Sequence, residues 1–522
     1  MMSNFQRRIA ADELRLGILK HLASLDMAFD QDIDGQRVVE SLRSKSVWLD
    51  CDTGHDDALA ILIAARSPDL RLLGISTVYG NAPLEKTTYN TRAVLQAIGR
   101  TDVPVYPGAS GPLEREACFA PGIHGETGLD GTTCLPKPTV EAKTDMSAID
   151  AMYRALSAQP AGTAWLVAVG TLTNVAKLFD KYPDLAEHIS GLSVMGGCIG
   201  EGFTDAPLGT IQAGDGAQDR CGNWTPFAEF NIYCDPEAAQ QIFSNPTLSR
   251  KATLIPLDLT HQFLATNRVQ LGLLFGFDMQ MHTEPTMNDV SAVRRLFFEI
   301  LTFFAKTYAE MFGLTAGPPT HDPLAVAVAL RPELFYCNGR GSADGLQNER
   351  FTIDIITEGE HGPAVENGRT ASQCGRTVAN GLVAGTDGVR IPRGLDSKAL
   401  WALLEGCLSR TERSMGEDAM FERRDTGGAL PSQHAVDTGS EDMASLVHGS
   451  NVTLSQFEMS TGLLPDIAAI DKEPGYGGHF LETNKEKQLG ITPRNLNLTR
   501  AQQSRADEDE DEGKRTKRSR GL

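Results

Sequence analysis

Residues 47–57 read VWLDCDTGHDD and are followed by ALAILIAA at residues 58–65. The apolar start of this stretch, residues 47–49, predicts a buried strand, and residues 58–65 predict a buried helix. The aspartates therefore lie on a strand-to-helix turn at the carboxyl end of a strand, which is where open α/β sheets bind their ligands.

Four aspartates occur within residues 50–57 of this turn. Carboxylates this close repel one another unless a cation lies between them or some of them are protonated. Carboxylate oxygens are hard ligands, which favours Ca²⁺ or Mg²⁺ over zinc or copper. One or two aspartates would also suit a helix N-terminus that binds no metal. Four of them beside an apolar strand favour a metal site.

The composition excludes several classes of protein. Of the 522 residues, 41% are hydrophobic and 22% are charged, which is ordinary for a soluble protein. The formal net charge of −20 argues against nucleic-acid binding. No apolar run approaches the roughly 18 residues of a membrane span, and the first residues lack the apolar core of a signal peptide. The nine cysteines form no CxxC pair, so we expect neither a zinc ribbon nor a disulfide framework, and we expect a cytoplasmic location.

Three segments differ in character along the chain. Residues 1–44 have helical spacing and are interpreted as an N-terminal helical extension. Residues 45–409 alternate strand and helix patterns, which predicts an α/β, Rossmann-like domain with a mainly parallel central sheet flanked by helices. Residues 410–522 are of low complexity and are expected to form a disordered tail. The basic cluster at residues 514–520 leaves nuclear import open beside a merely solvated tail.

Individual elements can be assigned within the middle segment. Strands are predicted at residues 47–49, 72–78, 164–169, 191–195 and 252–257, and helices at 58–65, 84–98, from 174 and at 297–308. The aromatic stripe of residues 297–308 is interpreted as core rather than as a base-stacking platform. Residues 200–222 are rich in Gly, Ala and Asp and are interpreted as a flexible surface insertion.

Further polar motifs follow the predicted strands, where a parallel sheet would gather them at one edge. They are Gly80–Asn81, GTLTN at residues 170–174, FAEFN at residues 227–231 and HDP at residues 321–323. Each alone has a simpler reading, because Asn after Gly is a common turn and HDP is a good helix start. Their joint occurrence in this order indicates a shared site.

The motifs together resemble the calcium-dependent nucleoside hydrolases, over residues 47–408. The family's DxDxxxDDA turn matches residues 50–58. Other matching motifs are STVYGN (76–81), IHGETG (123–128), GTLTN (170–174), AEFN (228–231) with DPEAA (235–239), DLTH (258–261) and HDP (321–323).

The resemblance implies a Ca²⁺ site. Asp52, Asp57 and Asp322 match its carboxylate ligands, and the main-chain carbonyl of Val169 matches a backbone ligand. Because the ligand is a main-chain carbonyl, any side chain is compatible with this role, including that of valine.

The resemblance also implies catalytic and substrate-binding residues. Asp56 matches the general base that activates a Ca²⁺-bound water, Asn81 matches a residue that positions this water, and His321 matches the histidine that protonates the departing base. The substrate-binding positions are Asn81, His124, Asn223, Glu229, Asn231 and Asp322, with His124 in a loop over the pocket. The insertion at residues 200–222 lies directly before Asn223. His55 stands where many members carry an apolar residue, and we expect its side chain to face solvent.

The expected activity is hydrolysis of a ribonucleoside to ribose and free base. Uridine is the first candidate substrate and inosine the next, with cytidine and nicotinamide riboside left open. We expect a small-molecule ribonucleoside as partner, no nucleic acid or membrane, and a homo-oligomer, either a dimer or a tetramer.

Two other classes remain as alternatives at this point. Haloacid-dehalogenase-like phosphatases also carry DxD after a strand, but their motif wants Thr or Val where Gly54 stands. A non-catalytic nucleoside-binding protein would explain the same pocket without turnover.

Overall fold

The computed structural model describes residues 44–208, 210–213, 216–277, 290–337, 349–361, 365–366, 369–370 and 372–425. All of these residues belong to one of the two compact units into which the chain divides, and the other unit, Leu464–Leu522, lies outside the described residues. The predicted N-terminal helix and the charged residues near the C-terminus also lie outside them. In the part of the chain so described, every helix is too short or too polar to cross a bilayer.

A six-stranded sheet forms the centre of the fold, in the order β3-β2-β1-β4-β5-β8. Its strands are β1 (Lys45–Cys51), β2 (Leu70–Thr77), β3 (Val105–Pro107), β4 (Trp165–Ala168), β5 (Gly191–Met195) and β8 (Ala252–Ile255). Every neighbouring pair is parallel. The predicted α/β class and mainly parallel sheet are confirmed.

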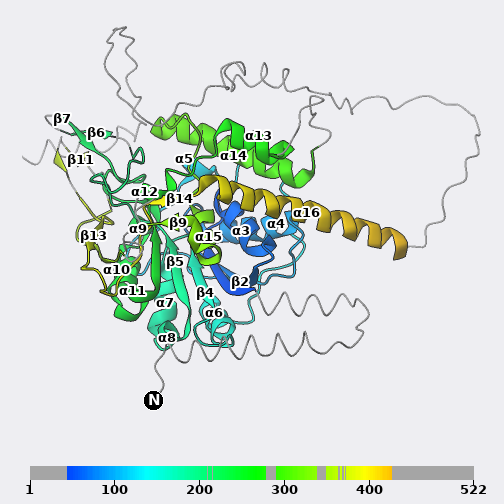
Figure 1. Cartoon of the computed structure of the whole chain (residues 1–522), viewed down its shortest axis with the longest axis horizontal. Helices are drawn as coiled ribbons and strands as arrows, with labels where there is room; N and C mark the ends of the chain where they lie inside the picture. The colour runs from blue at the N-terminus through cyan, green and yellow to red at the C-terminus, as the bar shows by residue number, and fades with distance from the viewer. Residues whose placement is uncertain are drawn as a thin grey trace, which may run out of the picture. The chain divides into compact units, whose positions relative to one another are not determined.

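The strands read as apolar runs because helices cover both faces of the sheet (Figure 1). In β1, Leu49 packs into one hydrophobic cluster and Trp48 into the other. The first cluster includes residues of α3 (Asp57–Arg66), α14 (Ala292–Phe312), α15 (Asp322–Leu330) and α16 (Ser397–Asp425). The second includes residues of α6 (Ala148–Ser157), α7 (Thr173–Lys181), α8 (Leu185–His188), α10 (Pro236–Ser244) and α11 (Pro246–Lys251).

The strand order fixes where a ligand can bind. From β1 the chain builds outward through β2 and β3, then returns to β4 on the other side of β1 and builds outward through β5 and β8. The order therefore reverses between β1 and β4, and the crevice at their carboxyl ends is the expected ligand site. The aspartate turn follows β1, and Val169 follows β4.

Helix α15 brings a distant part of the chain to this crevice. It is buried along its whole length, and its first residue is Asp322. Its burial explains the all-apolar sequence LAVAVAL, since a helix surrounded by core needs no polar face.

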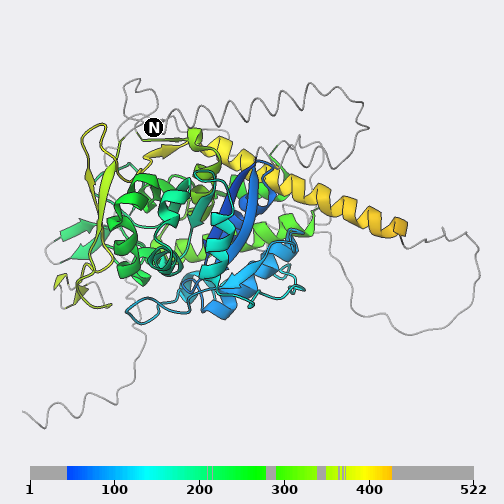
Figure 2. The same cartoon turned by 90° about the horizontal axis from the view of Figure 1, so that it is seen from below.

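The remaining described elements surround this framework (Figure 2). The other α-helices are α4 (Leu84–Ala97), α5 (Pro121–His124), α9 (Phe230–Cys234), α12 (Leu257–Thr260) and α13 (Asn267–Phe275), and a 3₁₀ helix, η2, spans Pro332–Leu334. Short antiparallel pairs are formed by β10 (Phe351–Ile355) with β13 (Thr377–Gly381), β9 (Phe335–Tyr336) with β14 (Gly394–Leu395), and β11 (Val365–Glu366) with β12 (Arg369–Thr370). A further pair, β6 (Thr210–Ala213) with β7 (Gly216–Asp219), lies within the predicted insertion at residues 200–222.

The predicted boundary at residues 409–410 falls inside α16, which continues to Asp425. Thr411 is fully buried, and the Arg410 guanidinium donates to the main-chain oxygen of Arg66 at 2.7 Å. Glu412 pairs with Arg294 at 2.9 Å. Residues 410–425 therefore belong to a helix and not to the predicted tail, and residues 410–412 make contacts with segments far away in the sequence.

Candidate active site

Three carboxyl groups meet beside a pocket. Oxygen atoms of Asp56, Asp57 and Asp322 lie within 4.8 Å of one another, and all three residues are buried. The turn after β1 holds Asp57 in place, because the backbone N–H groups of Asp52 and Gly54 donate to its two oxygens at 3.1 and 2.8 Å. The structure thus joins the aspartate turn to the start of α15, as the HDP motif indicated.

Asp52 lies beside this cluster in a tight space. Its Oδ2 accepts from the backbone N–H of Asn81 at 2.8 Å, whereas its buried Oδ1 has no partner among the described residues. A Cβ atom on Gly80 would lie 2.1 Å from Oδ2, and one on Gly170 would lie 2.8 Å from Oδ1. Both glycines are therefore required by the close approach of two loops to one carboxyl group.

The electrostatics of the cluster favour a cation. Burial, followed by repulsion from neighbouring carboxylates, raises the pKa of Asp56 from 3.8 to about 7. The pKa values of Asp52 and Asp322 are raised well above 3.8 for the same two reasons, and burial also raises that of Asp57. The donor set consists of oxygens only, and one of them, Asp52 Oδ1, is unpartnered. These residues fit a hard divalent cation.

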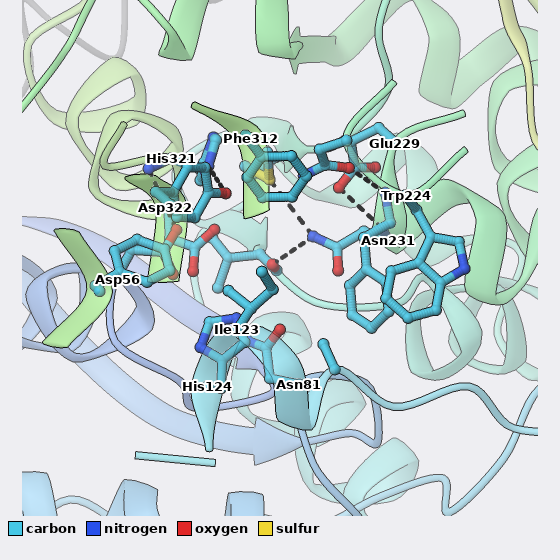
Figure 3. Close-up of a pocket in the computed structure, with 17 residues that line it drawn as sticks. Asp56, Asn81, Ile123, His124, Trp224, Glu229, Asn231, Phe312, His321 and Asp322 are labelled. Carbon is cyan, nitrogen blue, oxygen red and sulfur yellow. Dashed lines mark hydrogen bonds between the residues drawn. The ribbon is translucent and has the colours of Figure 1, made fainter. Parts of the chain in front are cut away.

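The pocket beside the cluster (Figure 3) has a volume of ≈ 480 Å³ when the open solvent at its mouth is included. It is lined by Asp56, Asn81, Ala120, Ile123, His124, Val169, Met195, Asn223, Trp224, Glu229, Phe230, Asn231, Phe304, Tyr308, Phe312, His321 and Asp322. All of the predicted site residues are among them except Asp52 and Asp57. In Figure 3, Asp56 and Asp322 lie on one side of the pocket, and Glu229, Asn231 and Trp224 lie on the other.

The polar side chains opposite the carboxylates are held by backbone groups. Glu229 caps α9, with Oε1 accepting from Asn231 N at 2.9 Å and Oε2 from Ile232 N at 3.0 Å and Gly197 N at 2.9 Å. The Asn231 amide donates to the carbonyl oxygen of Val169 at 2.9 Å. These bonds fix both side chains at the pocket wall before any substrate arrives.

His321 lies between two hydroxyl groups. Its Nδ1 is 2.7 Å from Thr260 Oγ1, and its Nε2 is 2.8 Å from the Tyr308 hydroxyl. Burial, and secondly the nearby His261, lowers the pKa of His321 well below 6.5, so the ring is neutral. The three groups form a chain of exchangeable protons that ends at the pocket wall.

The expectation that His55 faces solvent was wrong. The residue is 0% exposed, and its ring stacks on Phe303 and Phe304 at centroid distances of 5.2 and 5.3 Å. Its Nδ1 lies 3.1 Å from Nδ1 of His124. Burial lowers the pKa of His55 from 6.5 to about 4, and burial followed by the neighbouring histidines lowers that of His124 well below 6.5.

The sequence analysis did not predict that aromatic residues line the pocket. Phe304, Tyr308 and Phe312 come from α14, which we interpreted as a core helix, and Trp224 and Phe230 come from the segment around α9. The spacing of the three α14 residues by four places them on one face of the helix, and this spacing was the available signal. The helix serves both the core and the pocket.

Asp50 has a different environment from the other aspartates. It is 0% exposed, accepts from Asn174 Nδ2 at 2.8 Å and from the Ser76 hydroxyl, and does not line the pocket. A phosphatase of the DxD kind would need both aspartates of the pair to reach substrate. The position of Asp50 therefore argues against that alternative.

Comparison with known proteins agrees with this geometry. The model of the family described as inosine-uridine preferring nucleoside hydrolase matches residues 47–402. Uridine nucleosidase of Saccharomyces cerevisiae is 41% identical over 315 residues, which are 60% of this chain and 83% of that protein. The pyrimidine-specific ribonucleoside hydrolase RihA of Escherichia coli K12 is 37% identical over 297 residues, or 55% of this chain and 80% of that protein.

Among solved structures, the purine-preferring ribonucleoside hydrolase from Gardnerella vaginalis aligns with a TM-score of 0.54 and 25% identity, covering 70% of this chain and 99% of that chain. The resemblance inferred from the motifs is confirmed. The chain belongs to the inosine-uridine preferring nucleoside hydrolase family and is an N-glycosyl hydrolase.

Proposed function

We propose that the chain hydrolyses uridine and related ribonucleosides to ribose and free base, with Asp56 as general base and Ca²⁺ as cofactor. The observation that supports this proposal best is the convergence of Asp56, Asp57 and Asp322, of which Asp56 and Asp322 line one pocket. Asp52, Asp57, Asp322 and the Val169 carbonyl would hold the cation. When bound, Ca²⁺ supplies an anchor for the vicinal ribose hydroxyls and lowers the pKa of a water that it holds.

Asp56 is suited to take a proton from the attacking water. It lines the pocket, and it accepts from the backbone N–H of His321 at 3.2 Å, which fixes one carboxyl oxygen. Its pKa of about 7 lies near the operating range of a general base, and a nearby cation would favour the carboxylate form.

The ribose would bind between the carboxylates and the opposite polar wall. Asn223, Glu229 and Asn231 line that wall together and offer carbonyl, carboxylate and amide groups to hydroxyls. Because Glu229 and Asn231 are already bonded to the backbone, little side-chain freedom is lost when the sugar binds. Deoxyribonucleosides, which lack a hydroxyl at this wall and at the cation, should be poor substrates.

The leaving base would occupy the aromatic part of the pocket. A departing pyrimidine is a poor leaving group as an anion, so a proton must reach it as the bond breaks. We assign this proton to His321, whose ring is neutral in the free protein and would first take up a proton from solvent, then pass it along its 2.8 Å contact with the Tyr308 hydroxyl, which lines the pocket. Thr260 at the other ring nitrogen keeps the histidine oriented.

Uridine is the first candidate substrate because of two relatives that this chain matches over most of their length. One is a uridine nucleosidase and the other is a pyrimidine-specific ribonucleoside hydrolase. Inosine comes second. The expected cytoplasmic location and homo-oligomer remain predictions.

A ribose-release screen tests the proposal. Purified protein with Ca²⁺ is assayed on uridine, cytidine, inosine, nicotinamide riboside and 2′-deoxyuridine, and again after chelation and removal of metal. We expect release from uridine that depends on Ca²⁺ and little release from 2′-deoxyuridine. Full turnover by metal-stripped protein would exclude the metal assignment, and no turnover of any ribonucleoside with Ca²⁺ would exclude the function.

A further inference from the structure

A second histidine lies directly behind the pocket histidine His124. The His55 ring stacks on both Phe303 and Phe304, with interplanar angles of 8° and 5°. Its Nδ1 is 3.1 Å from His124 Nδ1, and its Nε2 is 2.9 Å from the main-chain oxygen of Asp130. The two rings therefore connect a loop carbonyl to the pocket.

The loop carbonyl is held in a fixed position. The Asp130 side chain accepts from the backbone N–H groups of Glu126 and Thr127 at 2.9 and 3.2 Å, and the Asp130 N–H donates to the His124 carbonyl at 3.2 Å. A Cβ on Gly54 would lie 2.5 Å from His124 Nδ1, so the glycine permits the close packing of the rings. Hydrogen bonds within this turn hold the Asp130 carbonyl in position to accept from His55.

The placement of protons along this chain follows from what each atom can do. A carbonyl oxygen only accepts, so His55 Nε2 must carry hydrogen. A neutral imidazole has one N–H, which leaves His55 Nδ1 bare. The hydrogen in the 3.1 Å contact between the rings then belongs to His124 Nδ1, and His124 Nε2 is bare.

One other contact would favour the opposite tautomer. The backbone N–H of His55 lies 3.4 Å from His124 Nδ1 and would donate to it if that nitrogen were bare. This 3.4 Å contact is longer than the contact between the two rings and the contact of His55 with the Asp130 carbonyl. A bare Nδ1 on His124 would also face the bare Nδ1 of His55 at 3.1 Å. The two shorter contacts decide the tautomer, because hydrogen bonds weaken with distance and bare nitrogens repel.

We propose that His55 is a positioning residue that fixes His124 as the Nδ1–H tautomer, so that His124 Nε2 accepts a hydrogen bond from an N–H group of the substrate base. His124 lines the pocket, and within the described part of the chain the hydrogen bonds of its ring are made at Nδ1, not at Nε2. The inference rests on the proposed function, since it describes base recognition in that same pocket.

The proposal names a class of base. In uridine, N1 is bonded to the ribose, so N3–H is the sole N–H of the ring system. Inosine likewise offers one ring N–H, whereas the ring nitrogen N3 of cytidine is an acceptor and would face the lone pair of His124, so that cytidine could donate only from its exocyclic amino group. The site should therefore prefer bases with a lactam or imide N–H.

Nuclear magnetic resonance tests the tautomer without any turnover. In protein carrying ¹⁵N-labelled imidazoles, protonated and bare ring nitrogens are resolved, and the His124→Gln variant assigns the His124 signals. We expect hydrogen on Nδ1 of His124 in the wild type and loss of this single tautomer in His55→Leu, which keeps an apolar side chain against the phenylalanines. A His124 ring with hydrogen on Nε2 and a bare Nδ1 in the wild type would overturn the proposal.

Kinetics test the consequence, with 3-methyluridine as a probe that lacks the N3–H. We expect wild type to prefer uridine over 3-methyluridine in kcat/KM by about tenfold or more, the size of a lost hydrogen bond to a buried acceptor. His55→Leu should lower this ratio about tenfold, mainly through KM for uridine. His55→Asn, whose amide oxygen can accept from His124 Nδ1–H, should restore part of the ratio.

A matched control is His188→Leu. His188 Nε2 also contacts a main-chain carbonyl, that of Gln159 at 2.8 Å, but it does not line the pocket. It should keep the wild-type ratio. An unchanged ratio in His55→Leu would reject the proposal. If wild type cleaves no ribonucleoside, the proposed function fails, and the resonance experiment alone still decides the tautomer.

Discussion

The backbone N–H of His321 donates to Oδ2 of Asp56 at 3.2 Å, across 265 residues of sequence. This bond joins the turn after β1 to the start of α15, and so connects the proposed general base to the segment that carries the proposed acid. It also leaves Asp56 Oδ1 as the oxygen that is free of this donor. The proposed base, Asp56, and the proposed acid, His321, are thus positioned relative to each other by one tertiary hydrogen bond.

Asp56→Asn tests the role of the carboxylate while keeping its shape. The amide oxygen can still accept from the His321 N–H, but the side chain can no longer take a proton. We expect kcat for uridine to fall by about 10² to 10⁴, with KM changed little. The measurement is steady-state ribose release with Ca²⁺, beside Asp102→Asn, whose exposed carboxylate pairs with Arg100 far from the pocket. Equal kcat in Asp56→Asn and wild type would reject Asp56 as the base.

The stability of metal-free protein should fall as the pH rises. The folded-state pKa of Asp56 is about 7, above its ordinary value of 3.8, so the folded state binds more protons than the unfolded state between these values. Its stabilising contribution is complete below pH 3.8 and is lost as the pH rises through 7. We expect the Tm of chelator-treated protein to drop by several degrees between pH 5 and pH 7.5.

Calcium should reverse this loss. Metal binds deprotonated carboxylates, so its stabilisation grows with pH, and at 100 times its Kd it amounts to about 2.7 kcal/mol. Thermal unfolding with and without Ca²⁺ at both pH values measures the difference. A calcium shift of Tm that is larger at pH 5 than at pH 7.5 would contradict the assignment of these carboxylates as ligands.

The sheet could be predicted from the sequence because burial on both faces is a local signal. A strand such as β4 contacts helices on each side, and its sequence WLVA is therefore apolar throughout. The aspartate turn and the HDP motif were equally readable, since each combines a strand or helix end with residues that are costly to bury. The aspartate turn follows β1 and leads into α3, whereas the HDP motif opens α15, which packs against α3.

The environment of His55 could not be predicted, because it comes from residues about 250 positions away. The ring stacks on Phe303 and Phe304, and nothing within the DCDTGHDD sequence indicates them. The end of α16 was missed for a related reason. Its polar residues after Leu408 are satisfied by distant partners such as Arg294 and Arg66, whereas composition alone indicated an exposed tail.

Gly80→Ala should damage the metal site without unfolding the protein. Gly80 has φ +155°, and a Cβ there would lie 2.1 Å from Asp52 Oδ2, so this carboxyl group must move. We expect the Ca²⁺ concentration for half-maximal activity to rise at least tenfold. Gly111→Ala is the control, because its Cβ would meet nothing within 4 Å. Normal Ca²⁺ dependence in Gly80→Ala would show that Asp52 does not bind the metal.

Tyr308→Phe separates protonation of the base from the other steps. The variant removes the hydroxyl that lies 2.8 Å from His321 Nε2 and keeps the aromatic wall. We expect kcat for uridine to fall about tenfold to a hundredfold, because the leaving base loses its proton path. With 4-nitrophenyl β-D-riboside, whose leaving group needs no proton, kcat should be close to that of wild type.

Tyr336→Phe is the matched control for this variant, since its hydroxyl donates to the Leu395 carbonyl at 2.8 Å and does not line the pocket. It should retain wild-type kcat on both substrates. An equal loss on uridine and on the nitrophenyl riboside in Tyr308→Phe would mean that the hydroxyl supports the shape of the pocket rather than proton transfer. Because both substrates carry the same ribose, the comparison isolates the leaving group.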